Sequence, residues 1–214
     1  MGIFYFPCDF VYWKKIDNHE KYKSRLLQKL HENDNLLSNT HSSYLTNAST
    51  TVESLGHWIT NSDKDIIEDI VWKSLDELIT KLNARPNCSQ LKINNSFITN
   101  SWFMKYEERG SVAVHNHHEV FPPMMMDGKP YKMTFSMFYI LKNDNPGNQT
   151  EFIQPTMSGT SVSESYDTRF KTSEVEEIEE GTVVIFPSNL YHQVCPIEKP
   201  NRVILSFNIC STFQ

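Results

Sequence analysis

The first half of the chain contains two stretches whose apolar residues are spaced as on one face of a helix. The first begins at Asp17 or Asn18, either of which can cap a helix, and runs to about His31. The second runs from Ser62 to about Leu82. Their stripes comprise Tyr22, Leu26, Leu27 and Leu30 in the first, and Ile66, Ile67, Ile70, Val71, Leu75, Leu78 and Ile79 in the second. Such stripes predict two helices that pack against a sheet.

From about Phe97 to the end, the pattern changes to short apolar and β-branched runs separated by turn residues. Residues 3–14 form a similar run, and Pro7 within it suits a strand near a sheet edge. The segment from Glu32 to about Ser54 is rich in Asn, Ser and Thr and is expected to be a surface loop. The strands predicted in the second half are 98–106, 111–119, 132–141, 149–154, 159–165, 181–187, 190–195 and 202–210. Many short strands favour a sandwich or barrel over a parallel α/β sheet.

These elements predict one α+β, mainly β domain over residues 1–214. Residues 1–96 would form a helical support region, and residues 97–214 would form the β core on which the helices pack. A chain of 214 residues with 39% hydrophobic residues can bury a full core. We see no internal repeat and no linker that would divide it.

Charge and cysteine usage narrow the setting of the protein. The net charge of −6 argues against non-specific nucleic-acid binding. No apolar stretch reaches the length of a membrane span, and the N-terminus lacks the pattern of a signal peptide. The four cysteines are scattered without a CxxC pair and are expected to be reduced thiols. We therefore expect a cytoplasmic location with neither nucleic acid nor membrane as a partner; the oligomeric state is not predicted.

The densest group of potential metal ligands is the stretch GSVAVHNHHE at residues 110–119. As a β-strand it places Ala113, His115, His117 and Glu119 on one face. Residues two apart on a strand are about 6–7 Å apart, so their side chains can converge on one ion. The stretch therefore predicts a metal site; a merely polar rim is the alternative.

A loop with an unusual composition, VFPPMMMDGKPYK, follows this cluster. Pro122 and Pro123 do not fit a central strand, and three exposed methionines would be costly on an ordinary surface. The loop is either an apolar lid over a pocket or a segment whose Met124 to Met126 fill a local gap in the core.

The last part of the chain carries a second group of candidate site residues. A Gly turn at Gly181 precedes a buried strand, and the chain then returns to His192. One face of the final strand carries Arg202, Ile204, Ser206 and Asn208. A guanidinium that points from this face into a barrel needs an anionic partner, which a bound carboxylate would supply with bidentate geometry. Alternatively, Arg202 lies on the surface and pairs with an acid such as Glu198.

An H-x-H pair after a Gly turn, a distal His and an Arg ten residues beyond it resemble the iron(II)/2-oxoglutarate-dependent oxygenases. More narrowly, the chain resembles a group of small, often phage-encoded members of that superfamily, which would place it in the host cytoplasm. The resemblance rests on the stretches FPCDFVYWKKIDNHEKY, SWFMKYEERGSVAVHNHHE, SMFYILKN and FPSNLYHQV with NRVILSFN, so it spans nearly the whole chain.

The resemblance implies a double-stranded β-helix of the jelly-roll or cupin-like type, with a metal inside its mouth. The proximal His of the family corresponds to His115 and the distal His to His192. The Arg that binds the far carboxylate of 2-oxoglutarate corresponds to Arg202, with Ser206 on the same strand face. Tyr139 stands where prolyl-hydroxylase-like relatives have a hydroxyl that binds the cosubstrate.

One position departs from the family pattern. The usual triad is two His and one carboxylate, but His117 occupies the place of the acid. Either His115, His117 and His192 hold the metal, which the spacing from Gly110 favours, or His117, Glu119 and His192 do, which the charge of an iron(II) site favours.

The resemblance implies an enzyme that uses Fe(II), 2-oxoglutarate and O₂ to hydroxylate an unidentified substrate, either a peptide, such as a prolyl peptide, or a small molecule. Succinate and CO₂ would be released. Two other functions are compatible with the sequence. One is a three-His dioxygenase of the cupin type, which has no diacid for Arg202 to bind. The other is a non-catalytic β-sandwich binding module with an incidental His cluster.

Overall fold

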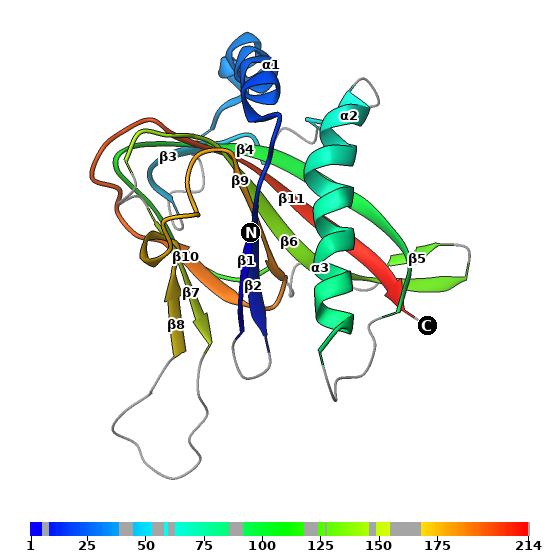
Figure 1. Cartoon of the computed structure of the whole chain (residues 1–214). Coiled ribbons are helices and arrows are strands. Elements are labelled where there is room, and N and C mark those ends of the chain that lie inside the picture. The colour runs from blue at the N-terminus through cyan, green and yellow to red at the C-terminus, as the bar shows by residue number, and fades with distance from the viewer. Residues whose placement is uncertain are drawn as a thin grey trace.

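The computed structural model describes residues 1–5, 9–38, 45–52, 58–59, 63–85, 92–117, 124–126, 128–145, 149–154 and 168–213. In this part of the chain, eleven strands form an antiparallel sheet with the order β1-β2-β9-β6-β11-β4-β10-β7-β8, while β3 pairs with β4 and β5 pairs with β6 (Figure 1). The strands are β1 (Gly2–Tyr5), β2 (Phe10–Lys15), β3 (Leu45–Thr50), β4 (Ile93–His115), β5 (Met124–Met126), β6 (Lys129–Asn143), β7 (Thr150–Gln154), β8 (Thr168–Lys171), β9 (Thr182–Pro187), β10 (Tyr191–Val194) and β11 (Arg202–Phe213).

The two predicted helices are present near the predicted positions. The first is α1 (His19–Glu32), whose buried residues include Tyr22, Leu26 and Leu30. The second is a continuous helical segment made of α2 (Lys64–Ile66), a π-helical stretch η3 (Ile67–Trp72) and α3 (Lys73–Asn83). Short 3₁₀ turns lie at η1 (Asp34–Leu36) and η4 (Thr172–Glu174).

The sheet separates two hydrophobic layers. One layer joins the helices to the outer face of the sheet and includes Leu78, Leu205 and Phe207. The other fills the inside of the curved sheet and includes Phe152 and Phe186. Because successive residues of a strand point to opposite faces, β11 contributes its odd-numbered residues from Val203 to Ile209 to the helix-facing layer. Its even-numbered residues from Arg202 to Asn208 therefore face the inside.

The longest strand, β4, changes partner along its length. Its first part pairs with β11 as far as Tyr106, and its last part pairs with β10 from Val112. Between them Arg109 has a positive φ of 59°, and a side chain on Gly110 would approach the carbonyl oxygen of Asn47 in β3 to 2.7 Å. The absence of a Cβ at Gly110 thus lets β3 pass close to this corner, which directs the end of β4 toward β10.

Most predicted strands are confirmed, with corrections at two places. Residues 45–50, expected in a surface loop, form the strand β3, which pairs with β4. The predicted strand at 98–106 and residues 111–115 of the predicted strand at 111–119 belong to the single strand β4, which ends at His115. The predicted strand at 159–165 lies outside the described residues.

In the Met-rich loop, residues 124–126 form β5, which pairs with β6. Met125 is 66% exposed, and Pro122 and Pro123 lie outside the described residues.

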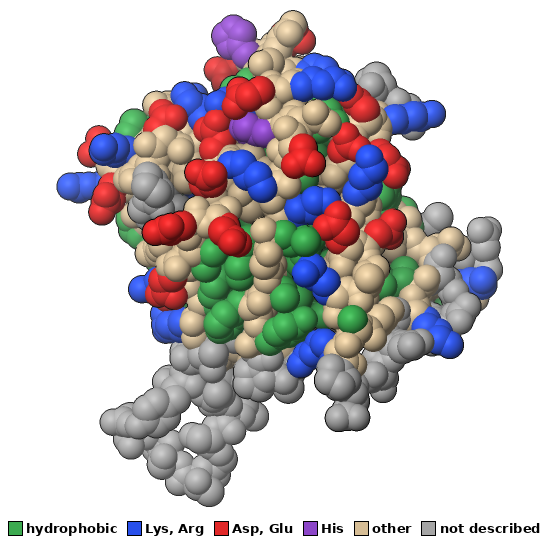
Figure 2. All heavy atoms as spheres, viewed as in Figure 1, with side chains coloured by type: hydrophobic (Ala, Val, Ile, Leu, Met, Phe, Trp, Pro, Cys, Tyr) green, Lys and Arg blue, Asp and Glu red, His purple; other side chains and the backbone are tan. Residues whose placement is uncertain are grey.

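Two further properties are the distribution of charge on the surface and the character of the helices. On the face shown in Figure 2, acidic and basic side chains are interspersed, and a hydrophobic area lies below them. Of the helices that the structure describes, none has the length and apolar character that a membrane crossing requires.

Candidate metal centre

Three histidines converge inside the curved sheet. His115, His117 and His192 each offer a ring nitrogen, and these nitrogens lie within 4.8 Å of one another. The ring centroids are 4.2 Å apart for His115 and His192, 5.1 Å for His117 and His192, and 5.2 Å for His115 and His117. This spacing suits three ligands of one metal ion.

An irregularity in β4 brings His115 to this cluster. His115 is the ladder partner of His192, and Val112 is the ladder partner of Val194. The step in β4 is therefore three residues where the step in β10 is two, so β4 carries one extra residue. A bulge of this kind interrupts the alternation of side chains and can re-aim one of them toward a site. Here it turns His115 to the face that Val112 also occupies.

His117 reaches the cluster from beyond the end of β4. Its backbone N–H donates a hydrogen bond to the carbonyl oxygen of Ser188 at 2.8 Å, in the turn between β9 and β10. Its ring lies 5.8 Å from the ring of Trp102. The prediction that this stretch is one strand is thus wrong at Asn116 and His117, and residues 118 and 119 lie outside the described residues. His115 and His117 nevertheless converge.

Hydrogen bonds at Nδ1 orient two of the rings. Nδ1 of His115 lies 2.8 Å from the carbonyl oxygen of Ala113, and Nδ1 of His192 lies 3.1 Å from that of Leu190. A carbonyl oxygen can only accept, so each Nδ1 carries the proton and donates it. Nε2 of both rings is therefore unprotonated and available to a metal.

The third ring is oriented by side chains. Nδ1 of His117 lies 2.7 Å from Oδ1 of Asn208 and 2.9 Å from Oγ of Ser136. The hydroxyl of Ser136 donates to the same Oδ1 at 2.9 Å. With Nδ1–H donating to Asn208, Nε2 of His117 is also the nitrogen available to a metal.

The surroundings keep these imidazoles neutral. His192 packs against Phe186 and Phe152, with ring centroids 4.7 and 6.0 Å away. Burial lowers the pKa of His115, and burial together with His115 lowers the pKa of His117 to about 4. Burial and the two neighbouring rings hold the pKa of His192 well below its usual value. Since a metal binds the neutral ring, such a site is ready for metal at neutral pH.

Arg202 is a fully buried cation on the same inner face, with a side chain that is 1% exposed. Its guanidinium donates to Oγ1 of Thr150 at 2.8 Å and to the carbonyl oxygen of Gln149 at 3.3 Å, and it lies 5.3 Å from the ring centroid of Tyr106. Its Nε has no hydrogen-bond partner in the described part of the chain. The expectation that Arg202 points into the barrel is met, and burial excludes the alternative of a surface Arg.

The ladder between β7 and β10 relates Arg202 to the histidines. Phe152 pairs with His192, and Thr150, which accepts from Arg202, pairs with Val194. The Arg202 guanidinium therefore lies at the level of Val194, the next inward-facing position after His192 on β10. Ser206 is buried on the same face of β11, between Arg202 and Asn208. A small molecule that reaches from the three histidines toward this guanidinium would meet a positive charge at its far end.

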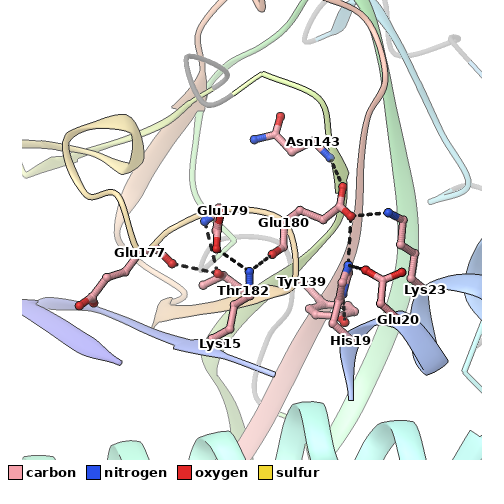
Figure 3. Close-up of polar contacts among 10 residues, drawn as sticks. All are labelled: Lys15, His19, Glu20, Lys23, Tyr139, Asn143, Glu177, Glu179, Glu180 and Thr182. Carbon is pink, nitrogen blue, oxygen red and sulfur yellow. Dashed lines mark hydrogen bonds and ion pairs between the residues drawn. The ribbon is translucent and has the colours of Figure 1, made fainter. Parts of the chain in front are cut away.

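The prediction for Tyr139 is wrong. Tyr139 belongs to the layer between sheet and helices, whereas its neighbours Phe138 and Ile140 face the inside. Its hydroxyl lies 2.5 Å from Nδ1 of His19 in α1, as Figure 3 shows. A shift of one residue along a strand moves a side chain to the other face, and this accounts for the error.

His19, Glu20 and Glu180 form a second group of three potential ligands within 4.8 Å. Nε2 of His19 lies 3.3 Å from Glu180, whose carboxylate also binds Nζ of Lys23 and, at 3.0 Å, the N–H of Asn143 (Figure 3). Burial acts to raise the pKa of Glu180, but these hydrogen bonds outweigh it and the pKa is lowered. A lysine ammonium thus already neutralises this carboxylate, and the group is a network that fastens α1 to the sheet.

Sequence reasoning missed the residues that support the centre, and it left one ligand question open. The strand pattern puts Asn208 on the inner face of the last strand. The contacts that Asn208 and Ser136 make with His117, however, depend on how separate strands pack together. Tyr106 beside Arg202 had no sequence signal. Glu119, the alternative carboxylate ligand, lies outside the described residues, so its part in the site stays a prediction.

Comparisons with known proteins agree with this geometry. A model of the 2OG-Fe(II) oxygenase superfamily matches residues 101–210, just over half of the chain. No curated protein sequence matches the chain. Among solved structures, the chain is similar to a prolyl-4-hydroxylase from Pseudomonas putida at 10% identity, covering 92% of this chain and 91% of that one with a TM-score of 0.53.

Two further solved structures cover nearly the whole chain. The viral collagen prolyl hydroxylase from Paramecium Bursaria Chlorella virus-1 is 16% identical and covers 94% of this chain and 97% of that one, with a TM-score of 0.53. OsALKBH1 is 14% identical and covers 97% and 99%, with a TM-score of 0.60. At these identities the likeness concerns the fold, and the predicted double-stranded β-helix with N-terminal helices is confirmed.

Proposed function

The chain belongs to the 2OG-Fe(II) oxygenase superfamily, and from this premise we propose that it hydroxylates its substrate at a centre formed by His115, His117 and His192. The observation that carries the proposal is the orientation of the three rings. Each Nδ1 is engaged in a hydrogen bond, which leaves three Nε2 atoms for one ion. The chemistry of this donor set fits iron(II), because imidazole is a good ligand for that ion.

The family cofactor would supply the oxidising chemistry: with iron(II), 2-oxoglutarate and O₂ give succinate and CO₂, and one oxygen atom enters a C–H bond of the substrate. The chain's own residues bind and orient. Phe152 and Phe186 line the inner side of His192 and exclude water from it. Removal of water strengthens the electrostatic interactions of the bound molecules.

Arg202 would bind the distal carboxylate of 2-oxoglutarate. A buried guanidinium without an acidic partner in the described part of the chain is unfavourable unless a ligand supplies the anion. The planar fork of Arg matches a carboxylate through two parallel hydrogen bonds. This residue also separates the proposal from a three-His dioxygenase of the cupin type, which would have no diacid to place there. Ser206, on the same inner face, would lie beside the cosubstrate.

The substrate that we propose is a peptide or a small molecule with an unactivated C–H bond. The structural likeness to two prolyl hydroxylases makes prolyl peptides the first candidates to be assayed. Because that likeness is one of fold, a panel of small molecules belongs in the same assay.

The experiment is an assay of succinate formation from 2-oxoglutarate by the iron-loaded protein, with and without candidate substrates. Wild type should form succinate, and His192→Ala should not. Absence of succinate from the wild type with every substrate and also without substrate would contradict the proposal. The ligand set is tested separately by iron binding: Glu119→Ala should bind iron like wild type and His115→Ala should lose it, and the reverse result would favour Glu119 as the ligand.

A further inference from the structure

We propose that Asn208 is a positioning residue that makes His117 a metal ligand, by holding its ring in the tautomer with the proton on Nδ1. The inference rests on the proposed function, because it concerns the same centre. It goes beyond that function in giving a role to a side chain that does not touch the metal.

The three rings differ in what orients them. For His115 and His192, the acceptor is the carbonyl of the residue two positions earlier in the chain, at Ala113 and Leu190. A backbone carbonyl cannot donate, so these two tautomers follow from the path of the strand itself. His117 lies after the end of β4, and both partners of its Nδ1 are side chains, Asn208 and Ser136.

Side-chain partners do not by themselves determine a tautomer. A serine hydroxyl can either donate or accept, and an amide can present its oxygen or its NH₂ group. If an NH₂ or O–H group donated to Nδ1 of His117, the proton of the neutral ring would be on Nε2. That nitrogen could then not bind a metal. The direction of the hydrogen bond at Nδ1 therefore decides whether His117 is a ligand.

A chain of hydrogen bonds settles the direction in favour of Nδ1–H. Oδ1 of Asn208 lies 2.7 Å from Nδ1 of His117, and it also accepts from Oγ of Ser136 at 2.9 Å. Oγ of Ser136 lies 3.1 Å from that of Ser188, whose hydroxyl can donate to it. Asn208, Ser136 and Ser188 are all buried, which holds the network in one arrangement.

The position of Asn208 links this role to the rest of the site. It stands on the inner face of β11, the strand whose first residue is Arg202. One strand would thus position both a metal ligand and the cation for the cosubstrate. A carboxylate at position 117 would have no tautomer to fix, so the need for Asn208 arises from the presence of His at that position.

The first test is ring ¹⁵N NMR of histidine-labelled protein without metal at neutral pH. In wild type the ring of His117 should be protonated on Nδ1. In Asn208→Leu, which removes the acceptor, the ring should shift toward protonation on Nε2, whereas Asn208→Asp, which keeps an acceptor, should retain the wild-type form. A wild-type ring protonated on Nε2, or an unchanged tautomer in Asn208→Leu, would overturn the inference.

The second test is anaerobic titration of iron(II) into the same proteins. Loss of a group that orients a ligand typically lowers metal affinity about 10- to 100-fold, so we expect this for Asn208→Leu and a wild-type-like affinity for Asn208→Asp. Asn100→Ala is the matched control: Asn100 is the ladder partner of Asn208 in β4, but its amide oxygen accepts from Thr99, so this variant should leave the affinity unchanged. Equal loss in Asn208→Asp and Asn208→Leu would overturn the inference.

A third comparison separates positioning from a merely structural role. In a His117→Asp background, Asn208→Leu should cost much less iron affinity than in wild type, because a carboxylate needs no tautomer. An equal cost in both backgrounds would overturn the inference. If Asn208→Leu does not fold, the smaller Asn208→Ala, which also removes the acceptor, replaces it with the same expectations. If wild type binds no iron(II), the proposed function fails, while the NMR result on metal-free protein still decides the role of Asn208.

Discussion

In the part of the chain that the structure describes, two groups of three potential metal ligands have their ligand atoms within 4.8 Å of one another, and they differ in what surrounds these atoms. In the cluster of His115, His117 and His192, every Nδ1 is engaged and no acid is a member. In the cluster of His19, Glu20 and Glu180, the Glu180 carboxylate is bound to Lys23, and both nitrogens of His19 are engaged by Tyr139 and Glu180.

This difference shows that spacing alone does not identify a metal site. A ligand atom must also be unprotonated and without a competing cation. The three-histidine cluster meets both conditions, whereas in the second cluster the Lys23 ammonium already binds the Glu180 carboxylate. The second cluster also lies elsewhere in the fold, because His19 is the first residue of α1. Gly181, which has a φ of 84°, packs so closely on the His19 ring that a Cβ there would approach it to 2.8 Å.

The largest expected effect is on metal binding. His192→Ala should abolish iron(II) binding, because a facial site with three ligands does not keep its geometry with two. His19→Gln, which replaces the buried histidine of the other cluster and keeps a hydrogen-bonding side chain, should bind iron like wild type. Metal analysis after anaerobic reconstitution and desalting measures both. Equal iron content in the two variants would show that the clusters have been assigned the wrong roles.

The next largest effect is on 2-oxoglutarate binding, and it compares two cations, the buried Arg202 and the half-buried Lys23. Arg202→Lys should weaken 2-oxoglutarate binding about 10- to 100-fold, since one charge-assisted hydrogen bond is worth about 1.5–3 kcal/mol and Lys lacks the planar fork. Lys23→Gln, at a cation that already has an acidic partner, should leave this affinity unchanged. Calorimetric titration of 2-oxoglutarate into the anaerobic iron complex measures both, and an unchanged affinity in Arg202→Lys would remove Arg202 from the binding site.

A smaller effect is expected on stability. Tyr139→Phe leaves Nδ1 of the buried His19 without its partner, so the free energy of unfolding should fall by about 1–3 kcal/mol. The affinity for 2-oxoglutarate should not change, because Tyr139 faces the helices. Urea unfolding and the calorimetric titration test the two halves of this statement. A weaker affinity without loss of stability would return Tyr139 to the cosubstrate site.

The smallest effect is a pH dependence that distinguishes the clusters. In the folded protein the pKa values of the three histidines lie below their ordinary value of 6.5, and that of His117 is about 4. Between pH 6.5 and about 4 the unfolded chain therefore binds more protons than the folded chain. The free energy of unfolding of the metal-free protein should therefore fall as the pH decreases from about 6.5 toward 4. The lowered pKa of Glu180 affects stability only as the pH falls below about 4.5.

Denaturant unfolding of metal-free protein at several pH values between 7 and 5 measures this dependence. His192→Gln should show a shallower dependence than wild type, because it removes one of the groups that must be neutral in the fold. A wild-type stability that is independent of pH in this range would contradict the burial of the histidines.

The sequence predicted the elements better than the exact faces of the strands. Hydrophobic periodicity located both helices and most strands, because their buried faces must be apolar. It missed β3, where only Ala48 and Thr50 are buried and the pairing with β4 is made by the backbone of a polar segment.

The candidate site was predictable as far as residue types and spacing determine it. His115, His117, His192 and Arg202 followed from the motif; the three histidines converge, and Arg202 is buried on the same inner face. The bulge before His115 could not be read from the sequence, because it depends on the pairing of β4 with β10. The same holds for the contact of Asn208 with His117 and for the face that Tyr139 occupies. Packing between strands and helices decides both.

The most direct measurement of the central claim is an anaerobic titration of 2-oxoglutarate into the iron(II) complex, followed by the metal-to-ligand charge-transfer absorbance. This band requires iron and the 2-oxo acid to be bound to each other in the same site. Wild type and His19→Gln should both develop the band and saturate at one 2-oxoglutarate per chain, and His192→Ala should show none. Absence of the band in wild type, or an unchanged band in His192→Ala, would contradict the assignment of the three histidines as the centre.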